Sequence, residues 1–111
     1  MIRPATPADV PMIAKLIRAL AEYERLAHAV VLKETDLHAH LFGARKYAEV
    51  LLAEDAGEVV GFALFFHNFS TFLAQPGIYL EDLFVRPEAR GQGVGRSLLE
   101  WLARKIGRAH V

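Results

Sequence analysis

A glycine-rich hexapeptide, Arg90-Gly91-Gln92-Gly93-Val94-Gly95, is the segment of this chain best suited to hold a ligand. Its alternating glycines let the backbone turn tightly and leave no side chain between a ligand and the main chain. An apolar helix pattern covers Gly93 to Lys105, and the first amides of a helix have no internal partner and carry partial positive charge. The segment therefore predicts a main-chain cradle for a phosphate or pyrophosphate group.

The spacing of this loop excludes two common phosphate-binding loops. A P-loop requires a lysine directly after its last glycine, and Gly95 is followed by Arg96. A dinucleotide fingerprint counted from Gly91 requires a third glycine at the position of Arg96. On the loop alone, a plain strand-to-helix turn that uses glycine only for its geometry is an equal alternative.

Two adjacent carboxylates, Glu81 and Asp82, interrupt the strand pattern from Ile78 to Val85. In a regular strand they point to opposite faces, unless a bulge intervenes. A primary amine has a pKa near ~10.4 and arrives protonated, so an enzyme that uses it needs acidic groups and a route for one proton. The acids therefore suit an amine site, while the alternative is a solvated strand end or pairing with Arg86 or Arg90.

Composition excludes several other kinds of chemistry. The 111 residues contain no cysteine, which removes disulfides, thiolate catalysis and cysteine-based zinc sites. His38 and His40 lie two apart on a predicted helix and face different ways, so no metal site is predicted. Lys+Arg and Asp+Glu balance at 13 each, which argues against a nucleic-acid partner. No apolar run is long enough for a membrane span and no secretory signal is visible, so we expect a cytoplasmic protein.

The elements that position these residues follow from hydrophobic periodicity. An amphipathic helix is predicted from residue 7 to about residue 26, opened by the capping-box pattern of Thr6 and Asp9, and a shorter helix ends at Gly43. Polar, turn-rich residues predict a loop over 68–77. Strands are predicted over residues 1–3 and over Tyr47–Glu54, Val59–Phe66 and Ile78–Val85. The pattern indicates one domain of mixed α/β (α+β) class, with a mostly antiparallel sheet flanked by helices.

The last six residues stand apart from this domain. Residues 106–111 read Ile-Gly-Arg-Ala-His-Val, the translation of ATC GGA AGA GCA CAC GTC, a string typical of a sequencing adapter. We expect a partial domain over residues 1–105 and a non-native tail over 106–111.

Taken together, the order of elements and four segments resemble the GNAT acetyltransferases, and within them the diamine (spermidine/spermine-type) N-acetyltransferase branch. The resemblance runs from Ile2 to about Trp101. The segments that carry it are Ile2–Thr6, Leu20–Glu24, Tyr79–Val85 and the loop Arg90–Gly95.

This resemblance implies the GNAT fold and transfer of an acetyl group from acetyl-CoA to a primary amine by direct attack. The main chain of Leu83, Phe84 and Val85 would bind the pantetheine arm as an added strand. Arg90 would contact phosphate or neutralise Glu88. The pyrophosphate would be held by Gly91, Gln92, Gly93, Val94, Gly95 and Arg96, and the amine would be met by Tyr23, Glu24, Glu81 and Asp82.

The resemblance also implies features that this chain does not contain. The family's tyrosine acid, which protonates the departing thiolate, and the later strands of the sheet would lie beyond residue 111. Relatives in this branch are often homodimers. The substrate is expected to be a small polyamine or a lysine-like amine. The alternatives are a peptide amino terminus, another metabolite amine, and a non-catalytic acyl-CoA-binding module.

Overall fold

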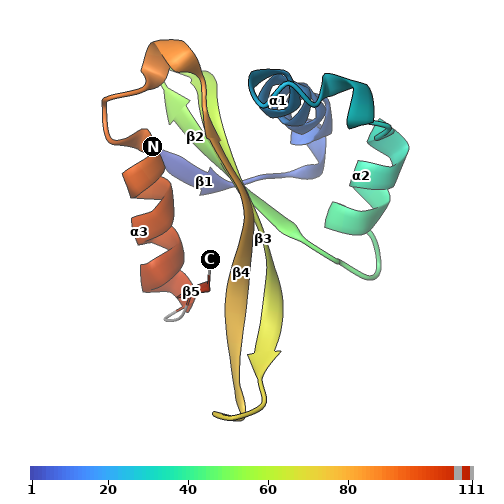
Figure 1. The fold of residues 1–111 in the computed structure, drawn as a ribbon, viewed down its shortest axis with the longest axis vertical. Helices are drawn as coiled ribbons and strands as arrows, with labels where there is room; N and C mark the ends of the chain where they lie inside the picture. The colour runs from blue at the N-terminus through green and yellow to red at the C-terminus, as the bar shows by residue number, and fades with distance from the viewer. Residues whose placement is uncertain (107–108, 111) are drawn as a thin grey trace.

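The computed structural model describes residues 1–106 and 109–110 (Figure 1). The helices lie on two sides of a twisted sheet, with α3 on one side and α1 and α2 on the other (Figure 1). In chain order the elements are β1 (Ile2–Pro4), the short 3-10 helix η1 (Pro7–Asp9), α1 (Val10–Tyr23), η2 (Ala27–Ala29), α2 (Glu34–Phe42), β2 (Glu49–Asp55), β3 (Glu58–Ser70), β4 (Gln75–Val85), η3 (Pro87–Ala89), α3 (Val94–Ile106) and β5 (Ala109–His110).

The sheet has the strand order β1-β2-β3-β4-β5. The first four strands are antiparallel to their neighbours, as the sequence predicts. β5 is parallel to β4, which it meets at only two positions, Ile78 with Ala109 and Tyr79 with His110. The mixed class and the mostly antiparallel sheet are thus confirmed, and the short parallel strand is an addition to the prediction.

The start of the first helix confirms the predicted cap. The amide of Thr6 donates to the Asp9 carboxylate at 2.7 Å, and the Asp9 amide donates to the Thr6 carbonyl at 2.9 Å. Arg3 forms two hydrogen bonds with Asp9, at 2.8 and 2.9 Å, and a third with Glu54 at 2.8 Å. One arginine therefore joins β1, the helix start and the end of β2.

Two hydrophobic clusters hold the helices to the sheet. Because strand side chains alternate between faces, β2 to β4 supply apolar residues to both layers. One cluster packs under α3 around Leu98 and Leu102, and the other packs under α1 and α2 around Ile13, Leu16 and Leu41. The apolar spacing that predicts the helices is therefore the spacing that buries them.

The predicted loop over residues 68–77 is wrong for most of its length. β3 runs to Ser70 and β4 starts at Gln75, with Asn68 opposite Gly77 and Phe69 opposite Pro76. The turn needs only residues 71–74, where Ala74 takes a positive φ of 50°. This part of the hairpin reaches beyond the helices as a two-stranded arm (Figure 1). Because no helix covers it there, its side chains can be polar while the two strands pair.

β3 and β4 approach each other closely at Gly61. A Cβ added to Gly61 would lie 2.8 Å from the carbonyl oxygen of Phe84 and 3.4 Å from the Cα of Val85. Glycine is required at this position because a side chain would meet rigid backbone.

The predicted tail, residues 106–111, lies partly outside the described residues. Within it, Ile106 ends α3 and Ala109–His110 form β5. The pairing of β5 does not test where this segment comes from, so its origin stays a prediction.

Candidate active site

A β-bulge in β4 decides where the two adjacent acids lie. Phe65 of β3 is opposite Leu80 and Leu64 is opposite Asp82, so Glu81 is an extra residue without a partner. Leu80 packs with the cluster under α3, whereas Phe84 packs with the cluster under α1. The switch of faces falls at the extra residue, and it turns Glu81 and Asp82 toward the same face, the one that α1 covers. The bulge that the sequence left open is therefore present.

A third acid joins this pair from the end of α1. Glu24 directly follows the last residue of α1, Tyr23. Burial raises the pKa of the Asp82 carboxyl above its ordinary value, and the negative charges of Glu81 and Glu24 raise it further. The structure thus brings together the acids that the sequence analysis assigned to the amine, and it concentrates negative charge there before any ligand binds.

An aromatic and cationic cluster lies beside these acids. The guanidinium carbon of Arg90 lies 4.3 Å from the ring centre of Tyr23 and 5.6 Å from that of Phe84. The two rings meet edge to face with centres 6.4 Å apart. Arg90 Nε donates a hydrogen bond to the carbonyl oxygen of Val85 at 2.8 Å.

Sequence reasoning did not foresee these partners of Arg90. It offered a phosphate, Glu88 or the acids of β4, whereas the side chain contacts Val85 of β4 and Tyr23 of α1. The side chain of Phe84, which supports the guanidinium, was also missed. The signal available in the sequence was the aromatic side chain of Phe84, two positions after Asp82, an expected amine contact.

One edge of β4 is free close to this cluster. Among the described residues, β5 pairs only with Ile78 and Tyr79, so no strand lies along the outer edge from Leu80 to Val85. The Arg86 amide bonds to the Val60 carbonyl of β3 at 2.8 Å.

Main-chain groups of successive residues in a strand point to alternate sides. The bond between the Arg86 amide and the Val60 carbonyl therefore shows which residues face the free edge. The groups of Phe84 face β3, and those of Leu83 and Val85 face outward. The register therefore supports Leu83 and Val85 as an added-strand template, and it does not fit the expectation for Phe84.

The glycine-rich loop leads from this edge into α3. Gly91 and Gly93 have φ values of 81° and 80°, which favour glycine, and a Cβ at either would meet nothing within 4 Å. The first bond of the helix runs from the Ser97 amide to the Gly93 carbonyl at 2.9 Å. The amides of Val94, Gly95 and Arg96 precede it and have no carbonyl one turn earlier in the helix.

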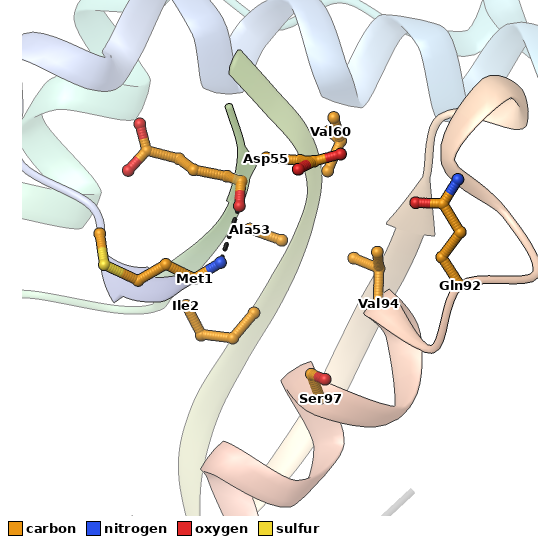
Figure 2. Close-up of a pocket in the computed structure, with 9 residues that line it drawn as sticks. Met1, Ile2, Ala53, Asp55, Val60, Gln92, Val94 and Ser97 are labelled. Atoms are coloured by element: carbon orange, nitrogen blue, oxygen red, sulfur yellow. Dashed lines mark hydrogen bonds between the residues drawn. The ribbon is translucent and has the colours of Figure 1, made fainter. Parts of the chain in front are cut away.

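Beyond Arg90, the side chains of the loop and of the first turn of α3 make their contacts away from the free edge. Arg96 Nε bonds to Glu100 one turn further along α3, at 3.1 Å. Gln92 and Val94 line a cavity of about 280 Å³ together with Ser97. The opposite wall comes from β1, β2 and β3, and Figure 2 shows the Gln92 amide on the loop side of this cavity. A ligand on the free edge of β4 would therefore meet the loop through its main chain.

The sequence predicts neither a metal site nor a membrane span. No cluster of three or more possible metal ligands occurs in the part of the chain that the structure describes. Within the same residues, no helix combines the length and the apolar character needed to cross a bilayer.

Comparisons with known proteins agree with this architecture. Residues 13–110 match the acetyltransferase (GNAT) family. A thialysine N-epsilon-acetyltransferase from Bos taurus is 41% identical over 111 residues, covering 93% of this chain and 65% of the relative. An L-ornithine N5-acetyltransferase from Arabidopsis thaliana is 32% identical over 149 residues, with shares of 94% and 65%. The chain thus spans a little under two thirds of the length of these relatives.

A solved structure shows the same fold at low identity. A ribosomal-protein-alanine N-acetyltransferase from Brucella melitensis biovar Abortus 2308 superposes with a TM-score of 0.76 at 20% identity, covering all of this chain and 80% of the other. The family match covers residues 13–110 and leads to one conclusion. The chain belongs to the GNAT family of acetyltransferases.

Proposed function

We propose that this chain is part of an N-acetyltransferase that transfers an acetyl group from acetyl-CoA to the primary amine of a small lysine-like or polyamine substrate. The observation that carries the proposal is the bulge at Glu81. It places two carboxylates on the face reached by Glu24, on the strand whose outer edge is free.

The residues present fit acetyl-CoA. Outward-facing main-chain groups of Leu83 and Val85 can bind the amides of a pantetheine arm as a strand would. The amides at the start of α3 and the open space at Gly91 and Gly93 suit a diphosphate. When bound, acetyl-CoA would supply an activated acyl group. Holding both reactants beside the bulge supplies the effect of proximity.

The acids of the site prepare the amine. A protonated amine is attracted to Glu24, Glu81 and Asp82, and its positive charge relieves the repulsion among them. A carboxylate with a raised pKa is also a stronger proton acceptor than an ordinary one. Asp82 has this property, since burial and two neighbouring charges raise its pKa. We therefore assign amine binding to all three acids and proton acceptance, directly or through water, to the pair at the bulge.

The substrate class is supported by the relatives. Their names give thialysine and L-ornithine as substrates, each a small amino acid with a side-chain amine. Several carboxylates around one site suit such amines, and they also suit a polyamine. We place the enzyme in the cytoplasm as a homodimer that binds no nucleic acid. The balanced charge argues against a nucleic-acid partner, the absence of cysteine supports the cytoplasm, and the family resemblance supports the dimer.

Calorimetry and an amine panel test this proposal. Acetyl-CoA is titrated into the chain. Release of free thiol is then followed on the protein completed with the later strands and the tyrosine acid expected beyond residue 111, with lysine, ornithine, spermidine and a peptide with a free amino terminus as substrates. We expect acetyl-CoA binding and turnover of a small amine. In Glu81→Gln the amine KM should rise about tenfold or more, because a charge-assisted contact is lost. The affinity for acetyl-CoA should stay within about twofold. The matched control is Glu34→Gln, on the first turn of α2.

Each outcome of these measurements selects a function. Turnover of the peptide alone would replace the small amine with a peptide amino terminus as the substrate. Acetyl-CoA binding without turnover of any amine by the completed protein would make it a non-catalytic acyl-CoA-binding module. Absence of acetyl-CoA binding would refute the assignment of the loop and the free edge.

A further inference from the structure

Arg90 touches both halves of the site at once. Its Nε bonds to the carbonyl oxygen of Val85, which faces the free edge of β4 that we assign to pantetheine. Its guanidinium lies over the ring of Tyr23, which we assign to the amine side. In this arrangement one side chain occupies an acceptor needed by the cofactor and an aromatic face needed by a substrate cation.

We propose that Arg90 is a latch that couples the two binding events: its closed position blocks both the Val85 carbonyl and the Tyr23 ring, and either ligand opens it. This inference rests on the proposed function, because it uses the assignments of the two halves. The loop next to Arg90 offers the open position, since Gly91 removes any side chain there and a bound diphosphate attracts the freed guanidinium.

The contacts of Arg90 set the size of the coupling. The closed latch has one hydrogen bond and one close cation–π contact, which together favour it by a factor of about ten. Each ligand then binds about tenfold more weakly to the free protein than to protein whose latch the other ligand has opened. Because coupling is reciprocal, coenzyme A must raise the amine affinity by the same factor by which the amine raises the coenzyme A affinity.

Two variants separate the latch from the charge of Arg90. Arg90→Lys keeps a cation for the diphosphate but loses the planar group that bonds and stacks at the same time. Tyr23→Leu removes the stacking ring and keeps Arg90. Arg45→Lys, in the exposed segment after α2, is the matched control.

The closing experiment measures the affinity for lysine by calorimetry, with and without saturating desulfo-coenzyme A, which cannot transfer an acetyl group. In the wild-type chain and in Arg45→Lys, desulfo-coenzyme A should raise the lysine affinity about tenfold. In Arg90→Lys the two lysine affinities should agree within about twofold, and the value without the analogue should already be high. In Tyr23→Leu the lysine affinity should fall in both conditions, with coupling below threefold.

The outcomes distinguish this inference from the function beneath it. A wild-type chain that binds no desulfo-coenzyme A would overturn the proposed function and the latch with it. A wild-type chain that binds the analogue but shows no coupling would overturn the latch alone. Tenfold coupling that persists in Arg90→Lys would do the same.

Discussion

The close approach of β3 and β4 at Gly61 makes the substitution Gly61→Ala a test of how rigid the edge beside the site is. The added Cβ would lie 2.8 Å from the Phe84 carbonyl oxygen. Because this atom belongs to a backbone paired on β3, it cannot rotate away, and the strands must separate by several tenths of an ångström. Overpacking of this kind costs about 2 kcal/mol. The lower entropy of alanine in the unfolded chain returns roughly 0.5 kcal/mol. We therefore expect a net loss of about 1.5 kcal/mol.

Gly95→Ala supplies the matched control, since it adds the same methyl group to the chain. Its Cβ would meet only the side chains of Leu83 and Val85, both at 3.8 Å, which is ordinary contact. Gly95 lies in the first turn of α3, where alanine is the better helix former by up to about 1 kcal/mol. Gly61→Ala should therefore lower the stability, and Gly95→Ala should leave it unchanged or raise it.

Urea unfolding followed by circular dichroism measures both variants at one pH. The midpoint should fall for Gly61→Ala and stay level or rise for Gly95→Ala, with unchanged m-values. The melting temperature of Gly61→Ala should drop by roughly 8 °C. Equal stability of the two variants would refute the reasoning, because it would mean that β4 moves away from β3 at no cost.

Three further predictions concern the acids. Asp9→Asn should destabilise the fold by about 2 kcal/mol at pH 7, because it weakens the paired bonds from Arg3, and thermal melts measure the loss. Arg3 also holds the pKa of Asp9 well below its usual range. The stabilisation is therefore complete above the ordinary Asp pKa of about 3.9, and it is lost as pH falls toward the pKa of Asp9 in the folded state. A stability difference between the two proteins that stays constant down to pH 2 would contradict this prediction. Asp82→Asn should instead raise stability at pH 7, because burial and two neighbouring acids raise the pKa of Asp82 in the folded state. Urea midpoints at pH 7 and pH 4 should show a gain in stability that shrinks on acidification. The same substitution should weaken lysine binding by about tenfold in calorimetry, and tighter lysine binding would remove Asp82 from the amine site.

Features set by local spacing could be predicted from the sequence. The helix around Ile13 and Leu16 follows from apolar periodicity, and the cap at Thr6 and Asp9 follows from a four-residue pattern. The glycine-rich loop is similar, because its geometry depends on residues that are neighbours in the chain. The GNAT resemblance joined these local signals into one fold.

Features set by pairing between distant residues could not be predicted in the same way. Two adjacent acids show that a bulge at Glu81 is possible, but the ladder with Leu64 and Phe65 decides it. The polar, turn-rich residues of the hairpin arm predict a loop, although pairing with the opposite strand keeps them extended. The partners of Arg90 were missed because Tyr23 lies 67 positions earlier in the chain. Whether Gly91 to Arg96 hold a cofactor stays a prediction.

The bulge has a genetic consequence. Because Glu81 alone is inserted between Leu80, which meets Phe65, and Asp82, which meets Leu64, removal of one codon would restore regular alternation without shifting any other partner. Such a deletion would keep every other residue pair between β3 and β4 and would remove one carboxylate together with the bulge. A regular sheet of this topology and a sheet with two adjacent acids on the same face thus differ by the insertion or deletion of a single codon.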